Sequence, residues 1–266
     1  MSRLLTFVRV DGHLLRVSIR GEGRPLLLVM GLGGNIEMWD PLERALNARG
    51  IQTIAYDASG MGDSPARLVP FRMAGLARQA AHLLGTLGFP AADVLGVSFG
   101  GAVAQALAHV NPERVRRLVL ASTTCGVSVP GHPVALALLA TPLRYYSPTF
   151  LRLTANALYG PTTNGDGARF REQMHARQAR PPTLWGYMSQ LAAAAGWTSL
   201  PWLHRLRAPT LVLSGGADRI VAPVNARILA ARIPGARLEV VPGAGHLLLM
   251  DHAEHCAQSI GEFLEA

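Results

Sequence analysis

The sequence predicts an α/β protein built around a mostly parallel sheet. Short apolar runs of strand length recur along its 266 residues, and helical stretches with a period near 3.6 residues lie between most of them. Parallel strands need a crossover connection, usually a helix, so this alternation indicates βαβ units whose helices cover both faces of the sheet. A hairpin at the start and a long helical stretch before residue 208 depart from the alternation.

The chain opens with two runs, Leu5 to Val10 and His13 to Ile19, separated only by Asp11-Gly12. An Asp-Gly connection favours a tight turn, so we expect an antiparallel hairpin here. Six further strands are expected, at Pro25 to Met30, Gln52 to Tyr56, Ala92 to Val97, Arg116 to Ala121, Pro209 to Ser214 and Ala236 to Val241. The helices that alternate with them are expected at Leu42 to Ala48, Met73 to Leu87, Gly101 to Val110, Pro223 to Ile233 and Asp251 to Leu264.

One long stretch, residues 128–207, contains no convincing strand. It holds helical pieces punctuated by Pro and Gly, at Pro133 to Leu143, Pro148 to Leu158, Ala168 to Arg180 and Thr183 to Ala195. A structureless loop of that length is improbable inside a compact domain. We therefore expect a core formed by residues 1–127 and 208–266, with a helical cap inserted at 128–207.

The composition excludes several classes of protein. Hydrophobic residues make up 49% of the chain, which is enough to bury a sizeable core and rules out a mainly disordered protein. All 25 basic residues are arginine, and with 17 acidic residues they give a net charge of +8. Charged residues are only 16% of the total, and the longest basic run is Arg116-Arg117. Because nucleic-acid binders cluster their basic residues, no nucleic-acid partner is expected.

The compartment is expected to be the cytoplasm. Arg9 and Asp11 interrupt the N-terminal apolar run before the core of a signal peptide could form. The longest apolar stretch, Pro133 to Leu143, is about half of what a membrane span needs, so no transmembrane segment is predicted. Two cysteines, Cys125 and Cys256, cannot build a disulfide framework or a cysteine metal site.

The candidate nucleophile is Ser98. It stands in Gly96-Val97-Ser98-Phe99-Gly100-Gly101, between an expected strand and an expected helix. In such a nucleophile elbow the serine projects its hydroxyl from a strained turn at the edge of the sheet. The flanking glycines are needed because a Cβ there would clash with the neighbouring strand and helix.

A serine nucleophile needs a base that takes its proton and a carboxylate that orients the base. His246 follows the last strand in a glycine-rich loop, where an imidazole can reach the carboxyl edge of the sheet. Asp218 follows the preceding strand, so the chain order is Ser, Asp, His. The other candidates are less well placed. Asp57 and Asp63 precede the serine, and we expect them to shape a loop. His252 and His255 lie on the following helix, where we expect a solvated or capping role, and no strand positions the cap histidines His132, His175 and His204.

Two backbone N–H groups are expected to form an oxyanion hole, which stabilises a tetrahedral intermediate. The loop Gly31-Leu32-Gly33-Gly34 follows a strand and offers the N–H of Leu32, and the elbow offers that of Phe99. Phosphate binding is the competing use of such a loop. The chain has no lysine for a phosphate-binding loop, and Ile36 occupies the third glycine position of a dinucleotide-binding motif. No cofactor and no metal ion are therefore expected.

Together these motifs resemble the α/β-hydrolase superfamily over nearly the whole chain, and more narrowly the intracellular depolymerases of medium-chain-length poly(3-hydroxyalkanoates). The narrower resemblance is carried by Gly31-Leu32-Gly33-Gly34-Asn35-Ile36-Glu37, Gly96-Val97-Ser98-Phe99-Gly100-Gly101-Ala102, Leu118-Val119-Leu120-Ala121-Ser122, Val129-Pro130-Gly131-His132-Pro133 and Gly196-Trp197-Thr198-Ser199-Leu200-Pro201-Trp202-Leu203-His204. It implies Ser98 as nucleophile, Asp218 as acid and His246 as base, and a polyester or its oligomers as substrate. The chain departs from the depolymerases at Phe99, where they carry Trp.

The same triad serves other chemistries, which stay open at this stage. They are general ester hydrolysis, lactone hydrolysis, carbon–carbon bond hydrolysis and perhydrolysis, and a ligand receptor without turnover. A serine nucleophile disfavours haloalkane dehalogenases and epoxide hydrolases, which use a carboxylate.

The positive charge concentrates in the expected cap. Residues 128–207 carry eight arginines and two acids, a net of +6 out of the total of +8. The cap sequence is also rich in apolar residues. An apolar and cationic cap predicts contact with an anionic, hydrophobic surface such as a coated polyester granule.

Overall fold

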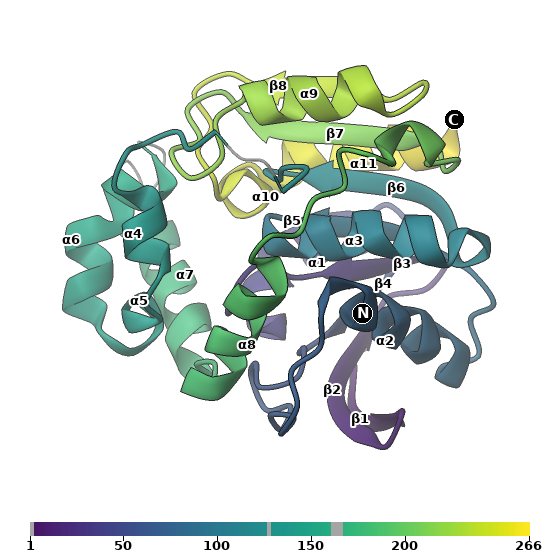
Figure 1. Cartoon of the computed structure of the whole chain (residues 1–266), viewed down its shortest axis with the longest axis horizontal. Coiled ribbons are helices and arrows are strands. Elements are labelled where there is room, and N and C mark those ends of the chain that lie inside the picture. Colours follow the sequence, from purple (N-terminus) through teal and green to yellow (C-terminus); the bar gives the residue numbers. More distant parts are fainter. Residues whose placement is uncertain (1–2, 127–128, 161–166) are drawn as a thin grey trace.

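The computed structural model describes residues 3–126, 129–160 and 167–266 and places eight strands in one sheet (Figure 1). The strands are β1 (Arg3–Val10), β2 (His13–Arg20), β3 (Arg24–Val29), β4 (Ile51–Tyr56), β5 (Ala92–Val97), β6 (Val115–Ala121), β7 (Thr210–Gly215) and β8 (Arg237–Val241). Their order is β1-β2-β4-β3-β5-β6-β7-β8. Strand β2 is antiparallel to both its neighbours, β1 and β4, and the other pairs are parallel. The predicted mostly parallel sheet with an N-terminal hairpin is confirmed.

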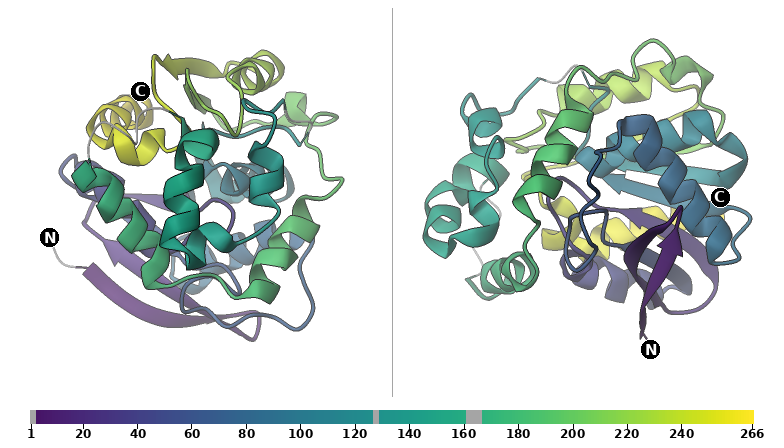
Figure 2. Two further views of the ribbon diagram at one scale, coloured as in Figure 1. Left: turned by 90° about the vertical axis from the view of Figure 1, so that its left-hand side faces the viewer. Right: turned by 60° about the horizontal axis from the view of Figure 1, so that its bottom comes forward.

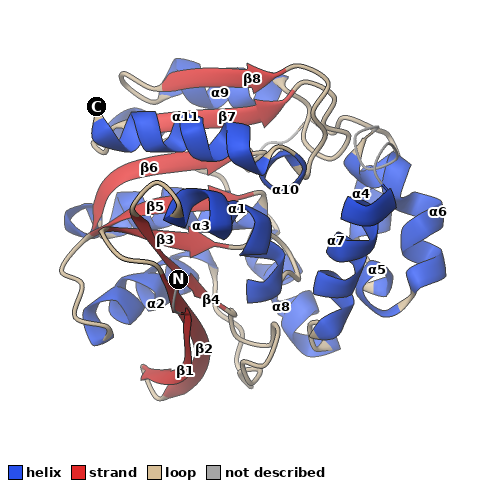
Figure 3. Cartoon of the chain, turned by 180° about the vertical axis from the view of Figure 1, so that it is seen from behind, coloured by secondary structure: helices blue, strands red, loops and turns tan. Residues whose placement is uncertain are grey.

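Helices cover both faces of the sheet (Figure 3). One face carries α2 (Met73–Thr86), α3 (Phe99–Val110) and α9 (Val224–Arg232). The other carries α1 (Asp40–Asn47), α10 (Leu248–Asp251) and α11 (Ala253–Glu265). In β3, Leu27 packs with the first group, and Leu26 and Leu28 pack with the second. Because alternate residues of a strand point to opposite faces, a continuous apolar run buries both sides of the sheet.

The chain between β6 and β7 is helical. It forms α4 (Ala135–Leu139), α5 (Leu143–Tyr146), α6 (Pro148–Tyr159), α7 (Gly167–Ala179) and α8 (Leu184–Ala194). We call its described residues, 129–160 and 167–207, the β6–β7 segment. Its helices lie to one side of the sheet (Figure 2), where residues of α4 and α6 pack against Ile220, Val221 and Leu247 of the loops after β7 and β8. The expected boundary at 127–128 lies outside the described residues.

Local sequence explains where these helices begin. Ser147 and Thr183 accept hydrogen bonds from the backbone N–H groups of Phe150 and Gly186, which caps the first turns of α6 and α8. The four-residue helix α5 was not predicted, because one turn is too short to show a periodic pattern. The last expected helix, Asp251 to Leu264, is α11, and a one-turn helix that was not predicted, α10, precedes it. The two are separated at His252, whose φ of −121° is not helical. No helix in the described parts of the chain has the length and apolar character needed to cross a membrane.

Candidate active site

Ser98 occupies the sharp turn between β5 and α3. Its backbone has φ 54° and ψ −122°, a left-handed conformation that costs a non-glycine residue free energy. The N–H of Ser98 donates to the carbonyl of Ala121 at 2.9 Å, and its own carbonyl accepts from the Thr123 hydroxyl at 2.7 Å and the Gly101 N–H at 2.9 Å. Neighbouring strand β6 and the loop after it thus hold the strained residue in place.

The glycines beside Ser98 are required by close approach of the backbone. A Cβ built on Gly96 would lie 2.4 Å from the carbonyl oxygen of Gly100, and one on Gly100 would lie 2.0 Å from that of Val29. Neither residue has a positive φ, so space, not backbone conformation, excludes a side chain at these positions. This is the clash with the neighbouring strand and helix that the motif predicts.

Asp218 and His246 stand at the carboxyl ends of the adjacent strands β7 and β8, and both are buried. The Nδ1 atom of His246 lies 2.8 Å from Oδ2 of Asp218. Because a carboxylate only accepts hydrogen bonds, this contact places the imidazole proton on Nδ1 and leaves Nε2 as an acceptor. The other carboxylate oxygen, Oδ1, accepts from the N–H groups of Ile220 and Val221 at 2.9 Å each.

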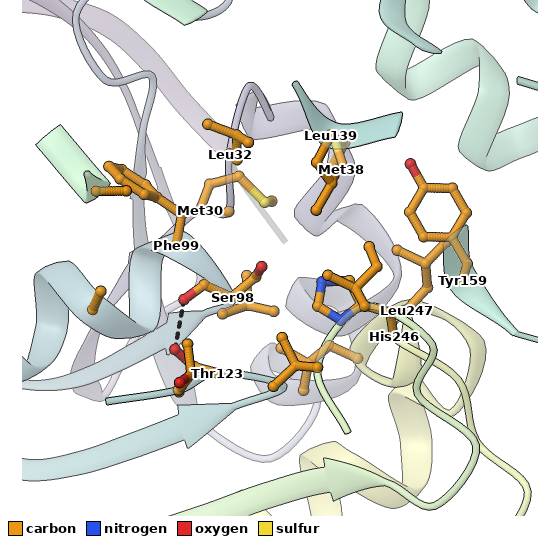
Figure 4. A pocket seen from close by; sticks show the side chains of 18 of the residues that line it. Met30, Leu32, Met38, Ser98, Phe99, Thr123, Leu139, Tyr159, His246 and Leu247 are labelled. Carbon is orange, nitrogen blue, oxygen red and sulfur yellow. Dashed lines mark hydrogen bonds between the residues drawn. The ribbon is translucent and has the colours of Figure 1, made fainter. Parts of the chain in front are cut away.

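Ser98 and His246 line one cavity of about 240 Å³. In Figure 4 the Ser98 hydroxyl points toward the His246 ring, with Met30, Leu139 and Leu247 around them. The wall that the core of the protein forms is mostly aliphatic and aromatic, and it includes Phe99. The β6–β7 segment supplies further apolar lining through Leu136, Leu139, Tyr145, Leu191 and Trp197. The cavity can therefore take an apolar chain beside a serine and a histidine.

The loop after β3 is held by side chains that the sequence did not single out. The carbonyl of Leu32 accepts from the Tyr145 hydroxyl at 2.5 Å and from Arg144 Nη2 at 3.1 Å. The next N–H, of Gly33, donates to Oε1 of Gln190 at 2.8 Å. Both polar groups of the peptide between Leu32 and Gly33 are thus bound by the β6–β7 segment, which fixes the orientation of the loop.

The two N–H groups expected to form the oxyanion hole remain available. The N–H of Leu32 has no hydrogen-bond acceptor among the described residues. The N–H of Phe99 lies in the first turn of α3, where an α-helix provides no acceptor of its own. Both residues line the cavity that contains Ser98. Two residues at this cavity thus carry backbone N–H groups for which the described residues provide no acceptor.

Asp57 lies outside the cavity and shapes loops. Its Oδ1 accepts from the N–H of Ile36, and its Oδ2 accepts from Arg16 and from the N–H of Asp63. Burial raises the pKa of Asp57 to about 6, although Arg16 and the backbone donors favour the charged form. In the described chain, no group of three His, Cys, Asp or Glu side chains is arranged to hold a metal ion.

The chain is similar to known hydrolases. A model of the family described as alpha/beta hydrolase fold matches residues 24–253. A poly(3-hydroxyalkanoate) depolymerase from Ectopseudomonas oleovorans is 40% identical over 263 residues, covering 97% of this chain and 91% of that protein. Two solved structures cover 98% of both chains: a hydrolase from Pseudomonas aeruginosa PA01, with a TM-score of 0.83 and 28% identity, and an esterase from Thermogutta terrifontis, with 0.82 and 27%.

Proposed function

The chain belongs to the α/β-hydrolase family and is an ester hydrolase, and from this premise we propose that it works through Ser98, His246 and Asp218. The observation that carries the proposal is the buried contact of 2.8 Å between His246 and Asp218, together with the cavity that His246 and Ser98 both line. The carboxylate orients the imidazole, and Nε2 of that imidazole is the base that the serine needs.

The proposed reaction has two halves. His246 removes the proton of Ser98 as Oγ attacks the ester carbonyl, and the N–H groups of Leu32 and Phe99 bind the oxyanion. The intermediate collapses and expels the alcohol, which His246 protonates, and the acyl group remains on Ser98. A water molecule activated by His246 then releases the acid. Loss of one oxyanion donor is expected to raise the barrier by roughly 3 kcal/mol.

The proposed substrate is a polyhydroxyalkanoate polyester, or its oligomers, with medium-length alkyl side chains. The 40% identity to a poly(3-hydroxyalkanoate) depolymerase supports this assignment. The lining of the cavity supports it as well, because Met30, Leu139, Leu191 and Leu247 offer an alkyl chain an apolar environment. The lining also includes Phe99, at the position where the depolymerases carry Trp.

We propose that the β6–β7 segment acts as a cap that also meets the polyester surface. The segment forms one side of the cavity and exposes large apolar side chains to solvent. These side chains are Val129, Val134, Leu136, Leu143, Tyr146, Leu153, Leu184, Trp185 and Met188. Exposed apolar groups in such number are typical of an interaction surface, which favours association with polyester granules.

The test of the mechanism is the variant Ser98→Ala with p-nitrophenyl butyrate as substrate. We expect kcat to fall by about 10⁶-fold with an unchanged melting temperature, because the nucleophile is lost and a small side chain is kept. A fluorophosphonate should label the wild-type protein at Ser98 and leave the variant unlabelled. Full activity in Ser98→Ala, or labelling without multiple turnover of any ester, would refute the proposal.

A further inference from the structure

Two buried arginines line the cavity that contains Ser98. Arg144, in α5, is 2% exposed, and Arg177, in α7, is 3% exposed. Their guanidinium groups lie against one ring, that of Tyr145, with Cζ at 4.7 Å and 5.9 Å from its centroid. The wall of the cavity next to Tyr145 therefore holds two fixed positive charges.

Among the described residues, the hydrogen-bond partners of both arginines are neutral groups. Arg144 donates to the Tyr187 hydroxyl at 2.6 Å and to the carbonyls of Leu32 and Thr141 at 3.1 and 3.4 Å. Arg177 donates through Nη1 to the Tyr159 hydroxyl at 2.8 Å, and its buried Nη2 has no hydrogen-bond partner in the described parts of the chain.

A third buried arginine, in contrast, is paired with carboxylates. Arg16 is also 3% exposed, and its guanidinium lies 2.6 Å from Glu37 and 3.1 Å from Asp57. No carboxylate of the described residues lies within ion-pair distance of Arg144 or Arg177. A buried charge without a counter-charge is costly, and such arginines are common where a ligand carboxylate binds.

We propose that Arg144 and Arg177 bind a free carboxylate of the substrate, so that the cavity selects esters that carry one. This inference rests on the proposed function and deepens it. In an oligomer of 3-hydroxyalkanoates, the chain-end carboxylate belongs to the alcohol half of the last ester. Water adds across that ester, the acyl–oxygen bond breaks, and the products are one 3-hydroxy acid and an oligomer shorter by one unit.

The two arginines are linked to the groups proposed to perform the chemistry. Arg144 binds the carbonyl of Leu32, in the loop whose N–H is proposed to hold the oxyanion. Arg177 binds the hydroxyl of Tyr159, whose carbonyl accepts the N–H of His246 at 2.8 Å. In Figure 4, His246 lies between Ser98 and Tyr159. A carboxylate near Tyr159 and an ester near Ser98 thus place the leaving alcohol on the side of His246, which protonates it.

The experiment compares two substrates that differ only in their terminal group. One is the dimer of 3-hydroxyoctanoate as the free acid, and the other is the same dimer as its terminal carboxamide. We expect the wild-type enzyme to prefer the acid in kcat/KM on the order of 10- to 100-fold, as for a charge-assisted hydrogen bond, and to lose part of this preference at high salt. Equal kcat/KM for the acid and the amide would overturn the inference. Failure to hydrolyse either dimer or any p-nitrophenyl ester would instead overturn the proposed function.

Substitutions of Arg177 test whether this residue produces the preference for the acid. In Arg177→Met the ratio of kcat/KM for acid over amide should fall toward one, mainly through KM for the acid, and Arg177→Lys should keep part of it. The matched control is Arg171→Met, which removes an exposed arginine from the same helix and should keep the wild-type ratio. A wild-type ratio in Arg177→Met, or an equal loss in Arg171→Met, would show that the preference does not arise at Arg177.

Discussion

The two carboxylate oxygens of Asp218 have different partners. These partners determine how the amide of an asparagine would be oriented at this position. Oδ1 accepts two backbone N–H groups and Oδ2 faces Nδ1 of His246. In Asp218→Asn the amide oxygen must occupy the Oδ1 position, because an NH₂ group there would face two donors. The NH₂ group then faces His246 and forces its proton onto Nε2, where it blocks the base.

We therefore expect Asp218→Asn to lower kcat for p-nitrophenyl butyrate by about 10⁴-fold while the protein stays folded. Steady-state kinetics and a thermal melt check both parts. Asp11→Asn is the matched control, since Asp11, in the turn between β1 and β2, forms an exposed pair at 2.7 Å with His82 of α2, and neither residue lines the cavity. That variant should keep its kcat. A fall of less than tenfold in Asp218→Asn would contradict the role assigned to the carboxylate.

At the scale of single elements, the elbow shows how tightly a strand, a turn and a helix are packed. Gly100, the second residue of α3, passes so close to β3 that any Cβ would overlap the carbonyl oxygen of Val29. Overlap with backbone cannot be relieved by a rotamer change. Gly100→Ala should therefore lower the free energy of unfolding by about 3 kcal/mol and also lower kcat, because the elbow carries Ser98.

Urea denaturation monitored by circular dichroism measures this change as a lower midpoint with an unchanged slope. Gly261→Ala is the control within α11, because the new Cβ would lie 3.6 Å from the Arg49 side chain, an ordinary contact. Helix propensity then predicts a gain of roughly 0.5 to 1 kcal/mol. If both alanine variants had the same midpoint as the wild type, the steric account of the elbow would be wrong.

At the scale of the whole molecule, the β6–β7 segment has two sides, one that lines the cavity and one in solvent. On the solvent side, Leu153 of α6 is 81% exposed. If this surface meets the polyester, Leu153→Ser should weaken adsorption to a medium-chain-length polyester latex by about 1 kcal/mol, or roughly fivefold, because apolar burial is lost. Hydrolysis of soluble p-nitrophenyl butyrate should be unchanged.

Adsorption isotherms on medium-chain and short-chain latexes, recorded at low and high salt, measure this change in affinity. Val110→Ser is the control, since this exposed valine ends α3 at the opposite end of the helix from the elbow and should not change adsorption. Hydrolysis of soluble esters together with no action on either latex would contradict the polyester assignment. Salt-insensitive adsorption would contradict an electrostatic contribution from the cap arginines.

The structure places part of the positive charge of the β6–β7 segment away from its outer surface. The sequence predicts a cationic outer surface from its excess of arginine over acids. Arg144 and Arg177 are instead buried at the cavity, and Arg180 forms ion pairs with Glu37 and Asp63 of the core. Part of the charge therefore serves the interior and the contact between segment and core, which leaves less of it for a surface partner.

The sequence by itself determined the architecture, because its physical signals are local. Alternating apolar runs and helical periods predicted all eight strands within two residues at each end, since burial on both faces of a sheet leaves a direct pattern in the chain. The glycine clash at the elbow, and the positions of Ser98, Asp218 and His246 after strands, follow from motifs a few residues long. The one-turn helices α5 and α10 left no such pattern.

Only the tertiary structure decided which distant residues support the candidate site. Tyr145 and Arg144 bind the carbonyl of Leu32 from more than 100 positions away, and Arg177 and Tyr159 meet through their side chains. Such contacts depend on how the segment docks on the sheet, and a lone Arg or Tyr in an irregular helix carries no periodicity that reports a partner. Whether an arginine stays in solvent or is buried at a cavity is a property of the packed molecule, because it depends on which surfaces pack around it.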